Sequence, residues 1–375
     1  MLLTSVGVVA GLIVAVALLP IVGGIGLAAR SLANSFDKLP ADLTAKPLPQ
    51  VSRIVAADGQ TIATFYSQDR LSVTLAEIPD SMQKAIIDIE DVRFYEHGGL
   101  DFKGTIRALL RNGATGTVTQ GGSTLTQQYV KNVLVENART EKEREAAVAD
   151  TLARKVREAK YAIELEHKLT KAQILDRYLN IVYFGDGAYG VGAAARHYFN
   201  EPVTALTLPQ SALLAGIVQS PVAYNPRFYP TLATERRNTV LSQMLKYNSI
   251  TQADYDAAVA APLNLDVHQQ PNDCVASKYP YFCDYVKHIF EVTPSLGLTL
   301  LRRGGLTVTT TLSPKIQKAA QKGIHQYVHA HEPSGVDAAE AIVKPGTGEV
   351  KAIAVGSPYG DNAKLGQNSI DLAVD

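Results

Sequence analysis

The chain has 375 residues, which is enough for two or more domains of ordinary size. Its 36 lysines and arginines balance 36 aspartates and glutamates, so the formal net charge is zero and no basic excess indicates a nucleic-acid partner. Tryptophan is absent, which excludes a tryptophan platform for sugars.

The first predicted element is a membrane anchor over residues 1–30. No charged side chain occurs in residues 1–29, and this apolar run exceeds the roughly 20 residues that span a bilayer. A cleaved signal peptide is the alternative, but its apolar core is usually shorter. The nearest basic residues follow the span, which by the positive-inside tendency would place the body in the cytoplasm. Residues 31–50 are rich in proline and polar residues and are predicted to be a tether.

A mainly helical domain is predicted over residues 51–265. It opens with two short strands around Asp58-Gly59, which is a hairpin signal. A helix follows that Asp80 would cap and that ends at Glu90. Apolar residues then recur at helical spacing along several segments. In the helix around position 158 the predicted buried stripe consists of Leu152, Val156, Ala159 and Ile163.

Residues 266–375 differ in character and are predicted to be a linker followed by the beginning of a second domain. GGLTVTTTL (304–312) is rich in β-branched residues, and AEAIVKPGTGEVKAIAVG reads as a hairpin around residues 345–348. Cys274 and Cys283 lie nine positions apart and could form a disulfide outside the cytosol. Two unrelated buried thiols are the alternative, and the spacing does not fit zinc.

The stretch IEDVRFYEHGGLDFKG, residues 89–104, is the first candidate for chemistry. Glu90 stands next to Asp91, and like charges this close raise one of the two pKa values. A carboxylate with a raised pKa can act as a general base near neutral pH. The alternative is a solvated helix end in which Arg93 neutralises its neighbours and His97 forms part of a turn.

Two further clusters carry cations and carboxylates. QGGSTLTQQYVKN feeds a turn into a helix whose free N–H groups form a natural anion site, with Lys131 two turns further on. An ordinary capped helix is the alternative. In ARKVREAKYAIELEHKL, Lys155 and Glu158 are spaced for an i,i+3 ion pair, while Glu164 and Glu166 are predicted to be solvated.

Two glycine- and proline-containing segments complete the pattern. RYLNIVYFGDGAYGVGAAA places four glycines in a helical run, which indicates close backbone packing or a ligand cleft. LLAGIVQSPVAYNP ends a buried helix in a turn. In this order, EDVRFYEHGGLD, GGSTLTQQ, RKVRE, YLNIVYFGDGAYGV and ALLAGIVQSPVAYNP closely resemble the five motifs of the peptidoglycan glycosyltransferases (glycosyltransferase family 51).

With the apolar N-terminus and the later β-rich region, the chain resembles the N-terminal part of a class A penicillin-binding protein. The five motifs cover residues 90–226. The resemblance implies a mainly α-helical, lysozyme-like glycosyltransferase domain after one transmembrane helix. A small β-rich linker and the start of a truncated transpeptidase domain would follow. No Ser-x-Asn or Lys-Thr-Gly element occurs, and Ser-x-x-Lys precedes the first motif, so transpeptidase activity is not predicted for this chain.

The resemblance also implies an activity. Family members polymerise lipid II into β-1,4-linked glycan strands by inverting glycosyl transfer and release polyprenyl pyrophosphate. Glu90 would deprotonate the acceptor hydroxyl and Glu158 would assist on the donor side. The predicted substrate-binding residues are Lys131, Arg139, Gln127, Ser123 and Lys155. The residues expected to support the shape of the site are Asp91, Arg93, His97 and Asp101.

The remaining expectations concern ligands, partners and location. A divalent cation, Mg²⁺ in the family, would arrive with the diphosphate, and no side-chain cluster resembles a preformed metal site. The expected partners are lipid II, the growing glycan, membrane lipid contacted by residues 102–120, and other cell-wall synthesis proteins. The resemblance places the body outside the cytoplasmic membrane on a single span, which overrides the weak charge argument. A lysozyme-like muramidase and a catalytically silent scaffold are the alternatives.

Overall fold

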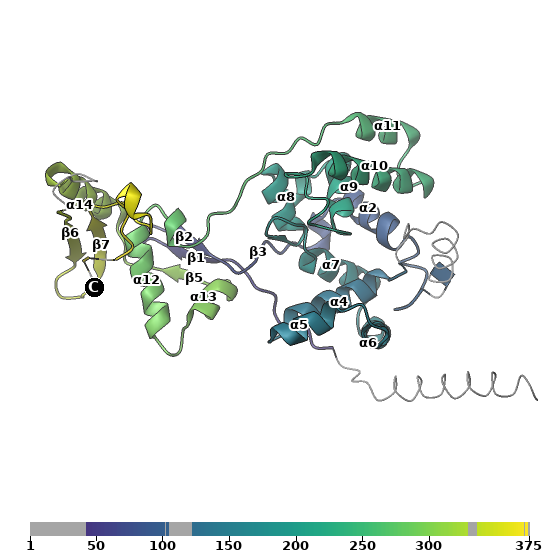
Figure 1. Ribbon diagram of the computed structural model, residues 1–375, viewed down its shortest axis with the longest axis horizontal. Helices are drawn as coiled ribbons and strands as arrows, with labels where there is room; N and C mark the ends of the chain where they lie inside the picture. Colours follow the sequence, from purple (N-terminus) through teal and green to yellow (C-terminus); the bar gives the residue numbers. More distant parts are fainter. Residues whose placement is uncertain (1–42, 102, 105–121, 329–335, 371, 374–375) are drawn as a thin grey trace, which may run out of the picture. The chain divides into compact units, whose positions relative to one another are not determined.

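The computed structural model describes residues 43–101, 103–104, 122–328, 336–370 and 372–373 (Figure 1). Two compact units contain them: a small unit with Arg93–Ile174 and the chain up to Lys46, and a large unit with Pro47–Val92 and Leu175–Asp375. No helix in this described part is both long and apolar enough to cross a bilayer. The predicted anchor, most of the tether and most of the segment expected to contact lipid lie outside it.

The small unit is helical. Its core helix α4 packs against both α5 and α6. The turn predicted before α4 is present, and Thr124 caps the helix. The backbone amide of Gln127 donates to Thr124 Oγ1 at 3.1 Å, and the backbone amide of Thr124 donates to Gln127 Oε1 at 2.9 Å. The helices of this unit are α4 (Leu125–Asn137), α5 (Glu141–Val148), α6 (Leu152–Lys168) and the first turn of α7 (Lys171–Ile181).

Helix α6 forms where it was predicted, but the predicted buried stripe is wrong. Leu152 is 71% exposed. The buried face instead carries Arg154, Glu158, Tyr161, Ala162 and Leu165. This face also has helical spacing, and it includes a pair of opposite charges that an apolar periodicity does not detect.

The large unit contains a helical part built around α9. Seven of the ten residues of α9 are buried, from Ser211 to Ile217, because this helix is apolar on all sides and is covered by α2 and α10. The buried residues of α2 include Met82, Ala85 and Ile86. The helices here are α2 (Asp80–Glu90), the rest of α7, α8 (Val191–Phe199), α9 (Leu208–Ile217), α10 (Pro230–Lys246) and α11 (Gln252–Ala260), with short 3₁₀ turns η1 (Leu75–Glu77) and η2 (Val203–Ala205).

The start of α2 differs from the prediction. Asp80 is the first residue of the helix, and Pro79 occupies the cap position. Proline has fixed the backbone before the helix, so an aspartate cap is not needed. The side chain of Gln83 donates to the carbonyl oxygens of Leu75 at 3.1 Å and Ile78 at 2.8 Å, which closes the preceding 3₁₀ turn.

Small sheets make up the strands of the large unit. The predicted hairpin is confirmed: β1 (Ser52–Val55) and β2 (Thr61–Phe65) pair antiparallel. β5 (Thr307–Thr309) adds to β1 in parallel, although it lies about 250 positions later in the chain. β3 (Asp69–Arg70) pairs with β4 (Ala188–Tyr189). The second predicted hairpin is β6 (Ala339–Val343) with β7 (Val350–Val355).

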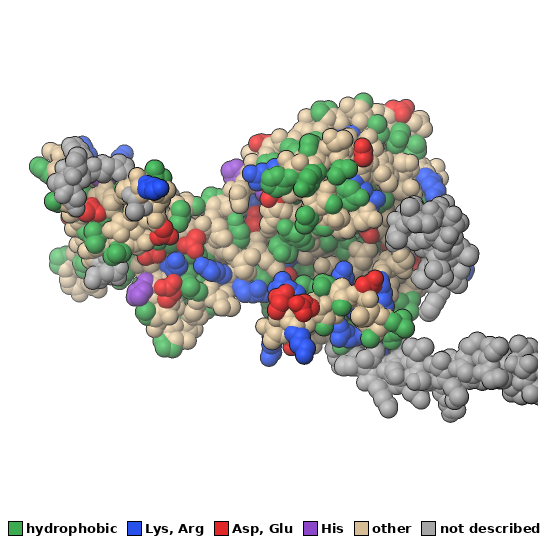
Figure 2. All heavy atoms as spheres, in the orientation of Figure 1, with side chains coloured by type: hydrophobic (Ala, Val, Ile, Leu, Met, Phe, Trp, Pro, Cys, Tyr) green, Lys and Arg blue, Asp and Glu red, His purple; other side chains and the backbone are tan. Residues whose placement is uncertain are grey.

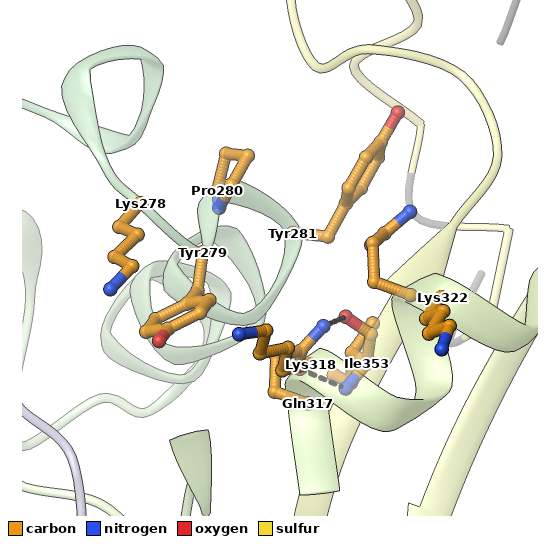
Figure 3. A pocket seen from close by; sticks show the side chains of 9 residues that line it. Lys278, Tyr279, Pro280, Tyr281, Gln317, Lys318, Lys322 and Ile353 are labelled. Atoms are coloured by element: carbon orange, nitrogen blue, oxygen red, sulfur yellow. Dashed lines mark hydrogen bonds between the residues drawn. The ribbon is translucent and has the colours of Figure 1, made fainter. Parts of the chain in front are cut away.

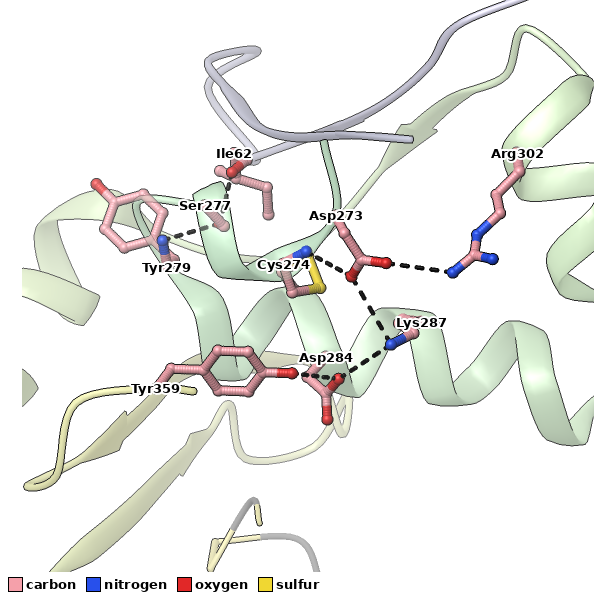
Figure 4. The surroundings of a disulfide bond; sticks show 10 residues. Ile62, Asp273, Cys274, Ser277, Tyr279, Asp284, Lys287, Arg302 and Tyr359 are labelled. Atoms are coloured by element: carbon pink, nitrogen blue, oxygen red, sulfur yellow. Dashed lines mark hydrogen bonds and ion pairs between the residues drawn. A yellow bond between two sulfur atoms is a disulfide. The ribbon is translucent and has the colours of Figure 1, made fainter. Parts of the chain in front are cut away.

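The β-containing part has its own apolar core, which includes a disulfide between Cys274 and Cys283 (Figure 4). Both cysteines are fully buried, and their Cα atoms are 5.5 Å apart. The bond joins the turn η3 (Cys274–Ala276) to α12 (Pro280–Val292). Beside it, Asp273 accepts from Arg302 at 3.2 Å and Tyr359 donates to Asp284 at 2.8 Å. α13 (Leu298–Arg303), α14 (Pro314–Tyr327) and the 3₁₀ turn η4 (Ala363–Leu365) complete this part.

α14 covers one edge of β7. The amide of Ser313, just before α14, donates to the Lys351 carbonyl at 2.9 Å. Gln317 then bonds both the amide and the carbonyl of Ile353, at 2.9 and 2.8 Å, and Gln321 donates to the Val355 carbonyl at 2.7 Å. Side chains of a helix therefore take the place of a neighbouring strand.

The described chain is mainly helical with a few small sheets, as predicted. On the face drawn in Figure 2, acidic and basic side chains are interspersed rather than gathered by sign, which agrees with the zero formal net charge.

Candidate active site

Glu90 is the last residue of α2, and its charge affects the pKa values of two side chains of the large unit, Tyr178 and Arg236. Burial raises the pKa of Tyr178 well above its ordinary value, and the charge of Glu90 raises it further. Burial lowers the pKa of Arg236, while the charge of Glu90 works in the opposite direction. Glu90 is thus within electrostatic reach of a buried neutral phenol and of a guanidinium, which is a setting unlike a solvated helix end.

Neither neighbour of Glu90 was predicted. Tyr178 belongs to the quoted motif RYLNIVYF, so the motif itself carried a signal for it. Arg236 lies in α10 outside all five motifs. Its Nε donates to the Gly216 carbonyl at 3.3 Å, and its guanidinium lies 5.8 Å from the Tyr224 ring centroid.

Asp88, two residues before Glu90, is also buried. Its Oδ2 has no hydrogen-bond partner in the described structure. Burial raises the pKa of this carboxyl, and Ser249 and Lys84 oppose the rise only in part. The end of α2 thus carries a carboxyl that the fold disfavours in its charged form.

The glycine-rich segment packs closely on backbone, which is one of the two predicted roles. A Cβ at Gly192 would lie 2.5 Å from the Leu71 carbonyl oxygen, and one at Gly190 would lie 2.8 Å from that of Asn180. The side chain of Asn180 completes the arrangement, because it accepts from the Val73 amide at 3.0 Å and donates to the Val73 carbonyl at 2.8 Å.

The small unit brings together parts of the first three motifs. Thr124 Oγ1 donates to the carbonyl of Gly99 at 2.8 Å. A Cβ at Gly99 would lie 2.5 Å from the backbone of Ala162 in α6, so only glycine fits there. The end of the first motif, the start of α4 and the helix of the RKVRE motif therefore form one packed assembly.

Glu158 is buried in that assembly and pairs with Arg154, one turn earlier on α6. The predicted pairing with Lys155 is wrong. Lys155 instead donates to Ser123 Oγ at 3.3 Å, which joins two of the predicted substrate-binding residues. The Arg154 guanidinium also bonds the Ala149 carbonyl, so the pair is held in place from both sides.

The other predicted substrate-binding residues lie along α4 and after it. Gln127 uses its carbonyl oxygen in the cap of α4. Lys131 is half-buried one turn further on. Arg139 lines a cavity of about 380 Å³ together with Arg157, and Arg157 Nε is buried without a hydrogen-bond partner in the described structure. Arg157 was not predicted, although it lies inside the RKVRE motif.

The predicted supporting residues of the first motif bond mainly to one another and to backbone. Arg93 and Asp101 form an ion pair, and Asp101 also accepts from the Gly104 amide at 2.8 Å. Partial burial alone would raise the pKa of Asp101, but these two donors hold it below its ordinary value. His97 Nδ1 lies 2.5 Å from the Gly98 carbonyl, and Asp91 is buried.

Glu166 was predicted to be solvated, and this is wrong. Its Oε1 accepts from Thr126 Oγ1 at 2.5 Å and from Lys171 Nζ at 2.8 Å. Lys171 Nζ in turn lies 4.5 Å from the centroid of the Phe94 ring. Glu166 therefore links Thr126 of the second motif, through Lys171, to Phe94 of the first motif.

Comparison with known proteins identifies the family of the chain. A family described as "Transglycosylase" matches residues 58–245. Penicillin-binding protein 1A of Escherichia coli is 38% identical over 74% of this chain and 30% of its own length. Penicillin-binding protein 2D of Bacillus subtilis is 36% identical over 83% of this chain and 43% of its own length.

Among solved structures, penicillin-binding protein 1A from Haemophilus influenzae aligns with a TM-score of 0.41 at 23% identity, over 76% of this chain and 30% of that one. The chain thus spans well under half the length of these relatives. The described motifs and the family match lead to one conclusion: the chain belongs to the transglycosylase family and carries the peptidoglycan glycosyltransferase domain of class A penicillin-binding proteins.

Proposed function

We propose that this domain polymerises lipid II into β-1,4-linked glycan strands by inverting glycosyl transfer, with release of polyprenyl pyrophosphate. The observation that supports it most directly is the setting of Glu90, at the end of α2 within reach of the buried Tyr178 and of Arg236. In the proposed reaction Glu90 accepts the proton of the acceptor hydroxyl as that oxygen attacks the donor sugar.

The small unit would supply the donor side of the reaction. Lys131 and Arg139 offset the negative charge that develops on the leaving pyrophosphate, which is commonly the largest contribution to such a step. The proposed polar contacts to the substrate are Ser123 and Lys155, which a hydrogen bond joins, and the side-chain NH2 group of Gln127, whose carbonyl oxygen serves in the cap of α4. Glu158 would act here through an ion pair with Arg154 that fixes its position.

Mg²⁺ enters the proposal as the counter-ion of the diphosphate. The side chains assigned to the substrate are ammonium, guanidinium, hydroxyl and amide groups, whereas Mg²⁺ sites in proteins rely on carboxylates and on substrate phosphates. These residues therefore fit a metal held by the substrate. Contrary to the expectation from the sequence, Asp91, His97 and Asp101 also form a cluster in which one ligand atom of each lies within 4.8 Å of the others, so these supporting residues could hold a cation themselves.

The proposal also includes three further properties. They are a lysozyme-like fold of the domain, a single membrane span, and a position of the body outside the cytoplasmic membrane. Two glutamates that serve glycosyl chemistry agree with a relation to lysozyme. The relatives are named penicillin-binding proteins, and a transpeptidase domain beginning near β6 and β7 is proposed by analogy with them.

The test is a lipid II assay on the full chain in detergent, with and without Mg²⁺. We expect strand growth with the wild type and a rate at least about 100-fold lower for Glu90→Gln, which removes the base and keeps the shape of the side chain. Glu96→Gln, at an exposed position of the same motif, is the matched control and should retain the wild-type rate.

Each other outcome would exclude the proposal in a definite way. Polymerisation by Glu90→Gln at the wild-type rate would show that Glu90 is not the base. Shortening of finished glycan in place of growth would identify a muramidase. A wild type that never polymerises, with or without Mg²⁺, would favour a scaffold.

A further inference from the structure

A second cavity of about 380 Å³ lies in the β-containing part of the large unit. None of its lining residues belongs to the candidate active site. Its walls come from the start of α12, from α14 and from β7, as Figure 3 shows. Tyr279, Pro280, Tyr281 and Ile353 give it a largely apolar surface.

Lys278, Lys318 and Lys322 also line this cavity, and no carboxylate does. None of these lysines forms an ion pair within the part of the chain that the structure describes. Lys278 makes only a weak contact, with its Nζ 5.5 Å from the centroid of the Tyr279 ring. The cavity thus carries three positive charges that no described side chain of opposite sign neutralises.

The sequence of α14 also supports a positively charged cavity. Lys318 and Lys322 are one turn apart, and like charges at this spacing destabilise a helix. The helix PKIQKAAQKGIHQY contains no acidic residue that would offset the repulsion. A helix with this charge pattern, in a chain of zero formal net charge, is suited to an anion that binds between its lysines and Lys278.

The polar groups in the cavity wall are fixed by other contacts. Both polar atoms of the Gln317 side chain bond to Ile353. The Tyr281 hydroxyl donates to the Asn368 carbonyl at 2.8 Å. The Tyr279 hydroxyl makes no hydrogen bond within the described residues, so it and the three ammonium groups remain available to a ligand.

We propose that this cavity binds a short acidic peptide. Its carboxylates would lie against the ammonium groups of Lys278, Lys318 and Lys322, and its aliphatic parts against Tyr279 and Tyr281. A bare phosphate fits less well. Two lysines one turn apart are separated by about 6 Å along the helix, and the walls between the charges are apolar. Several carboxylates on a carbon chain match that spacing better than one compact dianion.

The experiment measures binding of fluorescein-labelled triglutamate to the full chain by anisotropy at low ionic strength. We expect saturable binding that weakens about tenfold or more in Lys318→Gln/Lys322→Gln, because two ammonium contacts are lost. Lys315→Gln removes a lysine from the same helix that does not line the cavity, and this control should change the affinity less than twofold. Melting temperatures of all variants establish that they are folded.

Two competitors identify the chemistry that is recognised. Unlabelled triglutamine should not displace the probe, and inorganic phosphate should displace it only at much higher concentration than unlabelled triglutamate. The proposal is overturned if the wild type shows no saturable binding, or if Lys315→Gln weakens binding as much as the double variant. Displacement by phosphate at the same concentration as by triglutamate would likewise overturn it in favour of a simple anion site. The readout does not depend on glycosyl transfer, so the proposal stands or fails independently of the proposed activity.

Discussion

Arg154 and Glu158 form an ion pair on α6 in which the side chains are only 7% and 3% exposed to solvent. Opposite charges this deeply buried lose most of their hydration, and the pair compensates that loss only while both partners are present. Arg154, one turn before Glu158, therefore balances the charge of this buried side chain inside the small unit. The proposed catalytic role of Glu158 and the stability of α6 depend on the same contact.

The first prediction separates these two roles. Arg154→Met should lower the free energy of unfolding by about 3–5 kcal/mol, since it leaves the carboxylate of Glu158 buried without its partner. Arg154→Met/Glu158→Leu removes both charges and should recover most of the lost free energy of unfolding, while glycan polymerisation stays absent. Urea unfolding and the lipid II assay measure the two effects. A double variant that is no more stable than the single one would show that burial of the lone charge is not the cause.

The second prediction concerns Glu166. Glu166→Ala should lower the free energy of unfolding by about 1–3 kcal/mol, because the hydroxyl of the fully buried Thr126 loses its acceptor. Glu164→Ala on the same helix removes a carboxylate for which the structure shows no hydrogen bond, and should have little effect. Chemical denaturation of both variants provides the comparison. Equal stability of the two variants would contradict the structural role of Glu166.

The third prediction is a pH dependence at Asp88. The folded-state pKa of Asp88 is raised above its ordinary value of 3.8 by burial. The charged form therefore costs stability, and this cost is absent below the ordinary pKa and complete once the pH exceeds the folded pKa. Asp88→Asn should melt like the wild type near about pH 3 and at an increasingly higher temperature as the pH rises to about 7.

A matched control for this pH series is Asp80→Asn on the same helix. Asp80 is 75% exposed and lies 2.6 Å from Lys84, so its replacement should give no gain in melting temperature at any pH. If Asp88→Asn melts below the wild type at neutral pH, the charge at Asp88 is stabilising and the assignment is wrong.

The fourth prediction concerns the disulfide. Cys274→Ala/Cys283→Ala should lower the free energy of unfolding by about 2–3 kcal/mol, because the nine-residue separation closes a short loop. Both sulfurs are fully buried, so a thiol reagent added with mild reductant should label the cysteines only after denaturant is present. Rapid labelling of the native protein would show that this core opens without global unfolding.

Local signals predicted much of the fold. Both hairpins form at their turn residues, because Asp58-Gly59 and the segment at 345–348 specify tight turns irrespective of the rest of the chain. The helices predicted from apolar spacing around residues 152–163, 210–217 and 235–245 also form, as α6, α9 and α10. The parallel addition of β5 to β1 could not be predicted, because strand partners distant in sequence are chosen by tertiary packing and not by local preference.

The contacts within the candidate site could not be predicted from the sequence. The i,i+3 spacing of Lys155 and Glu158 predicted that these two residues pair with each other. In the structure Glu158 is buried and pairs with Arg154, whereas Lys155 is exposed and donates a hydrogen bond to Ser123. The apolar spacing also predicted the wrong buried face for α6, because the face that is buried includes the charged residues Arg154 and Glu158. Arg236 carried no sequence signal, since only the packing of α10 on α2 and α9 brings it near Glu90.

The contact of α14 with β7 has a consequence for how this part of the chain can vary. Four residues of α-helix advance about 6 Å and two residues of strand about 6.8 Å, so positions 313, 317 and 321 stay opposite positions 351, 353 and 355. Exchanging Gln317 or Gln321 removes the hydrogen bonds of that side chain and leaves the other positions aligned, while the contact at position 313 uses a backbone amide and does not depend on the side chain. Deleting a single residue from α14 rotates everything beyond it by about 100° and separates all later contacts at once. Across homologous sequences this helix should therefore accept substitutions far more readily than changes in length.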